Sequence, residues 1–240
     1  MAGIAGDAYL ASRASDAAFA RKFLRARDGD VAAALALMRG YFAMRRDHPR
    51  LFQLPSRVAD VLADGVFRLD LEGRSARGDL LLLFRPGAWD PARYDAWHVA
   101  AAPVPLLEVA AAAAAGAACS LVEVIDCARV SWRHLACMPV ALHRISVELS
   151  ERALPIRYRE IHVVNEGRVV SLAWRLLRPF VSEATRARLT FHGDDWRGVA
   201  RAVGAEHLLP PDPSSQMPPL SLDFATLDAT VSLLWSTFAP

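Results

Sequence analysis

LPIRYREIHVVNE, residues 154–166, joins two arginines to an apolar strand. The segment from Arg159 to Asn165 predicts an inner strand of a sheet, because its Ile and Val residues favour a pleated, buried surface. Arg157 and Arg159 are two residues apart, and alternate side chains of a strand point to the same face. The sequence therefore predicts two guanidinium groups on one face at the strand entry, where each can bind phosphate through two hydrogen bonds.

Similar apolar segments flank this strand on both sides. Residues 79–84 predict a strand, and its nearly continuous apolar character is typical of a strand buried on both faces. Further strands are predicted at 66–71, 120–126 and 188–192. Helical spacing of apolar residues predicts helices at 58–62, 91–118, 135–152, 169–181 and 195–203. Strands that alternate with helices predict an α/β fold, with a sheet flanked by helices.

The chain before this sheet is predicted to be helical. Apolar residues recur at helical spacing from Asp16 to Arg46, with a break at 28–30, and Asp30 can cap the second helix. Pro49 ends that helix. We expect a small N-terminal helical module at 1–50, an α/β domain at 51–209, and a Pro- and Ser-rich linker with a C-terminal tail at 210–240.

Composition limits the function classes. Hydrophobic residues make up 53% and charged residues 22%, which is typical of a chain with a packed core. The net charge of +2 argues against a nucleic-acid-binding chain of strongly basic character. Of 28 basic residues only Lys22 is a lysine, so nearly every cation is a guanidinium group suited to phosphate.

The cysteines and the apolar segments indicate the compartment. Cys119, Cys127 and Cys137 have no CxxC spacing and indicate free, mostly buried thiols in a reducing environment. The N-terminus lacks the pattern of a secretory signal, and the apolar stretch at 100–118 is too broken to span a bilayer. We therefore expect a cytoplasmic protein.

Signatures of catalysis are missing from the sequence. It contains no GxSxG, HExxH, P-loop or GxGxxG motif. The run His192–Asp195 could supply metal ligands but is interpreted as a polar loop with a helix cap, and Cys127 as a buried structural thiol. We expect neither an enzyme, nor a metal site, nor a cofactor.

Several blocks, in a fixed order, resemble the CRAL-TRIO (Sec14-like) family, and most closely its α-tocopherol transfer protein and retinaldehyde-binding protein branch. They cover roughly residues 19–209. The blocks are FLRARD at 23–28, RRDHP at 45–49, FRPGAWDP at 84–91, VID at 124–126, LPIRYREIHVVNE at 154–166, RPFVSE at 178–183 and FHG at 191–193.

The resemblance implies a helical module before a mixed sheet, one face of which forms an apolar pocket for a small hydrophobic ligand. It also implies a gate helix at 167–183 that opens toward a membrane. Tocopherol-, retinoid- or carotenoid-like molecules are expected ahead of phospholipid, in a monomer that docks peripherally on membranes. The helix at 135–149 is expected to line the pocket. The single pocket and gate residues expected are Leu121, Val122, Val124, Cys127, Ile161, Val163, Val169, Val170, Leu172, Ala173, Leu176, Leu177 and Phe180, although ordinary core packing could explain each.

The same resemblance implies a phosphoinositide site beside the gate. Its arginines correspond to Arg27, Arg157, Arg159 and Arg188 in this sequence. A lysine of the family pattern is replaced by Ala184, although Arg186 is close by in the sequence.

Other departures keep an alternative open. The family's Asn-Glu-Pro at the gate reads Asn165-Glu166-Gly167, which gives a hinge more freedom. Its C-terminal Tyr-Gly-Gly is missing after Leu209-Pro210, and the helical segment before residue 23 is short. These features fit either a divergent domain or an incomplete gene model. The alternative function is a membrane-recruited interaction module that transfers no ligand; a lipid-acting hydrolase would lack a nucleophile–base motif.

Overall fold

The computed structural model describes residues 17–52, 57–70, 74–113 and 120–204. The predicted linker and tail at 210–240, and Cys119, lie outside the described residues. The N-terminal helices are α2 (Ala17–Ala26), α3 (Val31–Asp47), η1 (Pro49–Leu51) and α4 (Val58–Ala63). The Asp30 carboxylate caps α3 by accepting a hydrogen bond from the Ala33 amide at 3.0 Å, as its sequence predicts.

A five-stranded sheet forms the centre of the molecule, in the order β1-β2-β3-β4-β5. Its strands are β1 (Phe67–Asp70), β2 (Leu80–Phe84), β3 (Ser120–Asp126), β4 (Arg157–Val164) and β5 (Leu189–Phe191). β1 is antiparallel to β2, and the other pairs are parallel. The mixed α/β fold predicted from the sequence is therefore confirmed.

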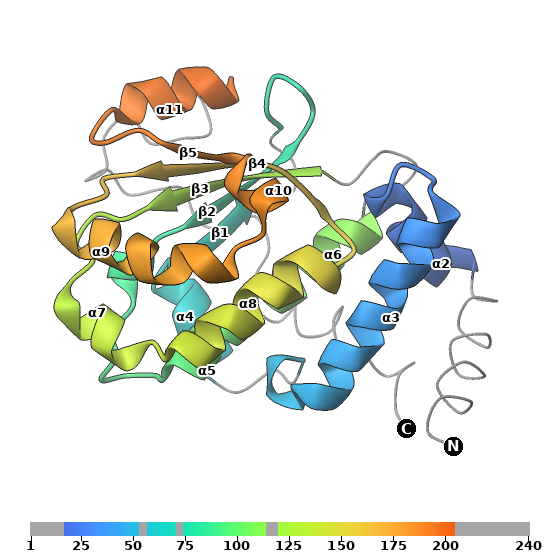
Figure 1. The fold of residues 1–240 in the computed structure, drawn as a ribbon, viewed down its shortest axis with the longest axis horizontal. Coiled ribbons are helices and arrows are strands. Elements are labelled where there is room, and N and C mark those ends of the chain that lie inside the picture. The colour runs from blue at the N-terminus through green and yellow to red at the C-terminus, as the bar shows by residue number, and fades with distance from the viewer. Residues whose placement is uncertain (1–16, 53–56, 71–73, 114–119, 205–240) are drawn as a thin grey trace.

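Helices connect each parallel strand to the next. They are η2 (Pro86–Ala88), α5 (Ala96–Ala101), α6 (Pro103–Ala113), α7 (Trp132–Cys137), α8 (Val140–Arg152), α9 (Arg168–Leu177), η3 (Arg178–Phe180) and α10 (Glu183–Arg186), and α11 (Trp196–Val203) follows β5. Strands in sequential order with right-handed crossovers place their connecting helices on one side of the sheet. α5 and α8 lie on that side and α11 lies on the other (Figure 1).

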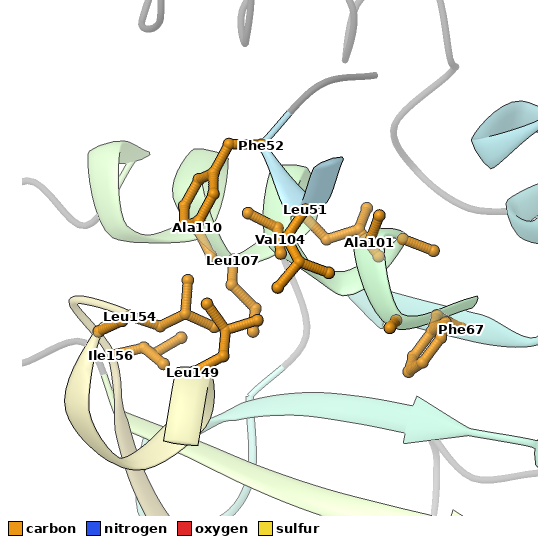
Figure 2. Close-up of a cluster of buried hydrophobic side chains, with 14 of the residues drawn as sticks. Leu51, Phe52, Phe67, Ala101, Val104, Leu107, Ala110, Leu149, Leu154 and Ile156 are labelled. Atoms are coloured by element: carbon orange, nitrogen blue, oxygen red, sulfur yellow. The ribbon is translucent and has the colours of Figure 1, made fainter. Parts of the chain in front are cut away.

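The two faces of the sheet have separate cores. On the outer face, the side of the sheet that α11 covers, Leu81, Leu83, Val122, Val124 and Val164 pack against Trp196, Val199 and Val203. The opposite side, here called the cavity face, faces the connecting helices. There Leu149, Leu154 and Ile156 come close to Val104 and Leu107, with Leu51 and Phe52 on the same cluster (Figure 2).

The N-terminal helices share this second core. Phe23 and Tyr41 are fully buried, and their ring centroids are 5.6 Å apart. Lys22 of α2 donates to the Glu108 carboxylate of α6 at 2.8 Å, with both side chains buried. Because Lys22 also lies 4.5 Å from the Phe19 ring centroid, its charge is shielded by a carboxylate and aromatic faces together. The N-terminal helices therefore pack directly against the helical layer.

Candidate functional site

A cavity of about 900 Å³ lies between the cavity face of the sheet and helices α7 to α10. This volume suits one ligand of small to moderate size. The sheet forms its floor, α8 forms one wall, α9 forms the outer wall, and the end of α2 reaches its rim. The helices meet here because they belong to successive crossovers on one side of the sheet.

Strand periodicity decides which side chains form the floor. Ile125 and Cys127 from β3 and its C-terminal end line the cavity, together with Ile161 and Val163 from β4. Burial raises the pKa of the Cys127 thiol to about 12, so the thiol stays protonated and is a poor nucleophile at neutral pH.

The helix α9 covers this floor without a fully buried side chain of its own. Val170, Ala173, Trp174, Leu176 and Leu177 line the cavity. Leu176 is nevertheless 59% exposed, so the same side chain contacts both the cavity and the solvent. The helix α9 therefore has the cavity on one face and solvent on the other.

The hinge before α9 differs from the sequence prediction. Gly167 caps α9 with φ −82° and ψ −176°, which is extended backbone that any residue adopts. The left-handed residue is Asn165, at φ 58°. An asparagine tolerates that conformation better than most residues, so the sharp turn before α9 does not depend on a glycine.

The predicted pocket residues divide into four groups, the last of which, Val122 and Val124, lies in the outer-face core. Seven line the cavity: Cys127, Ile161, Val163, Val170, Ala173, Leu176 and Leu177. Leu121 is fully buried in the core beside it. Val169, Leu172 and Phe180 are not among the lining residues, and Leu172 and Phe180 are 38% and 42% exposed.

Val122 and Val124 require a correction. Both were expected in the pocket, yet they lie in the outer-face core against α11. Successive side chains of a strand alternate between faces, so Leu121, Glu123 and Ile125 take the cavity face while Val122 and Val124 take the other.

Polar side chains also line the cavity, among them Glu123, His134, His143, Ser146, Ser150 and Tyr158. His143 and Ser146 belong to the helix expected along the pocket, whereas the other four were not predicted. Burial raises the pKa of the Glu123 carboxyl to about 7 and lowers the pKa of His143. Burial, and then the charge of Glu123, raise the pKa of Tyr158 far above its ordinary range. Alternation counted back from Cys127 would have placed Glu123 on this face.

Three of the four predicted phosphate-binding arginines meet at the cavity rim: Arg27, Arg157 and Arg188. Burial, then the charges of Arg188 and Arg157, lower the pKa of Arg27, so the three guanidinium groups repel one another. Arg27 also donates to the Glu151 carbonyl at 3.2 Å, and Arg157 is paired with Asp28. Among the described residues, the Arg188 guanidinium has no carboxylate partner.

Arg159 lies elsewhere, which corrects the prediction of a shared face. The register between β3 and β4 shifts: Leu121 is opposite Tyr158, whereas Val122 is opposite Glu160, so Arg159 is an unpaired extra residue. The bulge breaks the alternation. The Arg159 Nε donates to Asp79 at 2.8 Å, and Arg159 does not line the cavity as Arg157 does.

The remaining candidates for chemistry have structural partners. His192 lies 2.9 Å from His162, and the Asp195 carboxylate caps α11 by accepting from the Gly198 amide at 2.8 Å. The described residues contain no cluster of three His, Cys, Asp or Glu residues placed to hold a metal ion. Within the same ranges, no helix has the length and apolarity needed to cross a bilayer.

Comparisons with known proteins agree with this architecture. Residues 70–209 match the model of the CRAL/TRIO domain. The human protein named alpha-tocopherol transfer protein-like is 31% identical over 186 residues, which is 77% of this chain and 54% of that protein. Clavesin-2 of Rattus norvegicus is 26% identical over 216 residues, which is 87% of this chain and 64% of that protein.

A solved structure shows the same fold. The crystal structure of Sfh5 superposes with a TM-score of 0.56 over 89% of this chain and 80% of that one, at 13% identity. The chain thus spans between about half and two thirds of the length of these curated relatives.

Proposed function

The chain belongs to the CRAL/TRIO domain family, and from that premise we propose that it holds one small hydrophobic molecule in its cavity and carries it between membranes. The observation that carries the proposal is the cavity of about 900 Å³, whose floor and outer wall are built mainly from apolar side chains. A pocket of this size and character suits one apolar molecule. Tocopherol-, retinoid- or carotenoid-like molecules are the proposed ligand class, and the proposed place of action is the cytosol.

The proposed gate is α9 together with η3. Trp132, Leu172, Leu176 and Phe180 are all exposed, at 59%, 38%, 59% and 42%, and are here called the apolar rim. Exposed apolar side chains often mark a surface that contacts a membrane or a partner, and of these four Leu176 also lines the cavity. We propose that the apolar rim enters the membrane surface when the gate opens, because Leu176 already contacts both the cavity and the solvent.

The rim arginines are the proposed electrostatic part of the membrane contact. Arg27, Arg157 and Arg188 concentrate positive charge at the cavity rim, and a phosphorylated headgroup would relieve their mutual repulsion. We propose that these three residues bind a phosphoinositide. Asp28 would compete for Arg157, so the headgroup must displace an existing ion pair. Arg159 forms an ion pair with Asp79 and is not part of the proposed headgroup site.

We propose no catalytic step. Cys127, the thiol on the cavity floor, stays protonated because burial raises its pKa to about 12. The carrier is proposed to act as a monomer that associates with membranes only peripherally.

A vesicle-to-vesicle transfer assay tests this function. Donor vesicles carry a fluorescent tocopherol or retinoid analogue, and acceptor vesicles carry a quencher and phosphoinositide. The proposal predicts transfer that rises linearly with protein concentration. Protein that binds the vesicles but transfers no analogue would support the interaction module instead.

A further inference from the structure

Glu123 is an acidic side chain in the middle of the apolar cavity face. It lies opposite Leu82 on β2 and opposite Ile161 on β4. On β3 itself, the neighbours that share its face are Leu121 and Ile125. Four apolar residues therefore surround one carboxyl group, and that carboxyl lines the cavity.

The Glu123 carboxyl has no partner among the described residues. The three buried acids of the described residues all have partners: Glu108 pairs with Lys22 at 2.8 Å, Asp79 with Arg159 at 2.8 Å, and Asp126 accepts from the Asn165 side chain at 2.8 Å. No described group donates a hydrogen bond to Glu123, and burial alone determines its pKa of about 7. The nearby Tyr158 hydroxyl interacts with Ser150 instead. An unpartnered carboxyl in an apolar cavity destabilises the protein unless a ligand or water satisfies it.

We propose that Glu123 is the polar anchor of the bound molecule and that the cavity selects a neutral, apolar ligand with one hydroxyl group, an alcohol or a phenol. This inference rests on the proposed carrier function and narrows its ligand class. A hydroxyl group can donate to the carboxylate and accept from the protonated acid. A hydrocarbon would leave Glu123 unpaired in both protonation states. An ester can only accept from the protonated acid and would leave the carboxylate unpaired, and the carboxylate would repel an anionic head.

Matched pairs of ligands that differ only in the head group test the anchor. The probes are all-trans-retinol with retinyl acetate, α-tocopherol with α-tocopheryl acetate, and retinoic acid as the anionic head. Their dissociation constants are measured with wild type, Glu123→Leu and Glu123→Gln. Wild type should bind at least one alcohol or phenol at least about tenfold tighter than its acetate, the effect of one buried hydrogen bond. It should bind retinoic acid more weakly than retinol.

The variants separate an anchor from a merely structural residue. Glu123→Leu should bind each alcohol and its acetate with equal affinity, and Glu123→Gln should keep part of the preference because an amide still accepts and donates. Glu148→Leu is the matched control, since Glu148 is an exposed acid on α8 outside the cavity. It should behave as wild type does.

The outcomes distinguish the two levels of the proposal. If wild type binds alcohols and acetates equally, or if Glu123→Leu keeps the wild-type preference, the anchor is refuted while the carrier function stands. If wild type binds none of the five probes, the proposed carrier function fails, and the anchor with it.

Discussion

The guanidinium of Arg159 is bound to the buried carboxylate of Asp79, through Nε at 2.8 Å. Asp79 has no exposed surface, and it also accepts hydrogen bonds from Ser120 and Ser75. The pair joins the start of β2 to β4 across the β-strand between them. An arginine that the sequence suggested for membrane binding therefore holds the sheet together.

Removal of Arg159 should lower stability. Arg159→Ala leaves Asp79 buried with only its serine partners, which we expect to lower the free energy of unfolding by about 2 kcal/mol. Arg77→Ala is the control, because Arg77 pairs with Glu160 at 2.8 Å but is 56% exposed, and such a pair contributes less than about 1 kcal/mol. Urea denaturation measures both. Equal losses for the two variants would contradict the structural role of Arg159.

Charge reversal at the cavity rim should weaken membrane binding. Arg157→Glu with Arg188→Glu removes two cations, each worth about 1 kcal/mol near an anionic surface, so binding to phosphoinositide vesicles should fall by more than about tenfold. The attraction should also weaken as salt is raised. Arg197→Glu with Arg201→Glu, on the far side of the sheet, is the matched control. The measurement is the amount of protein that sediments with the vesicles. An equal decrease for the two double variants would argue against a specific rim site.

Asp28 should oppose headgroup binding, because it is paired with Arg157. Asp28→Asn frees that guanidinium and removes a negative charge beside the rim. We expect vesicle binding to strengthen by about fivefold at low salt, the equivalent of about 1 kcal/mol. Asp30→Asn is a control close by on the rim, since Asp30 caps α3 instead of pairing with an arginine. Sedimentation of Asp28→Asn at or below the wild-type level would show that the ion pair does not compete with the headgroup.

The apolar rim should matter for transfer more than for stability. Phe180 is 42% exposed, so Phe180→Ala should cost less than about 1 kcal/mol of unfolding free energy while transfer between vesicles drops sharply. Trp196→Ala is the contrast, because Trp196 is 6% exposed in the α11 core and its truncation should cost about 3–5 kcal/mol. A stable Phe180→Ala protein with unchanged transfer would count against α9 and η3 as a gate.

Glu123 should make stability depend on pH. Burial raises its pKa from the usual 4.5 to about 7, so the folded protein holds this proton more tightly than the unfolded chain does. The contribution of Glu123 to the free energy of unfolding is therefore most favourable below pH 4.5 and is lost as the pH rises through 7. Because the cavity gives solvent some access to the carboxyl, the pKa shift should be partly screened, and we expect the free energy of unfolding to fall by about 2 kcal/mol. Glu123→Gln should remove that loss, and urea denaturation at pH 5 and pH 8 measures the difference. An unchanged difference in the variant would contradict the assignment.

The sequence predicted the elements well because their signals are local. The apolar run of β2 and the Asp30 cap of α3 depend on residues that are neighbours in the chain. The alternation of β3 side chains, which places Val122 on the outer face and Glu123 on the cavity face, can also be predicted from the sequence. The pocket prediction followed the apolar character of the β3 residues instead of this alternation. The pairing of Arg159 with Asp79 could not be predicted from local sequence, because it depends on a bulge in β4 and on a carboxylate that lies 80 residues away.

Native mass spectrometry of the purified protein tests the central claim most directly. The proposed carrier should retain one small lipid per chain in the cavity, so the intact mass should exceed the sequence mass by one ligand and fall to it on denaturation. Extraction of that ligand should yield a neutral, hydroxyl-bearing molecule. Protein that carries no lipid, and that takes none up from vesicles containing tocopherol or retinol, would contradict the account and leave a non-transferring interaction module in its place.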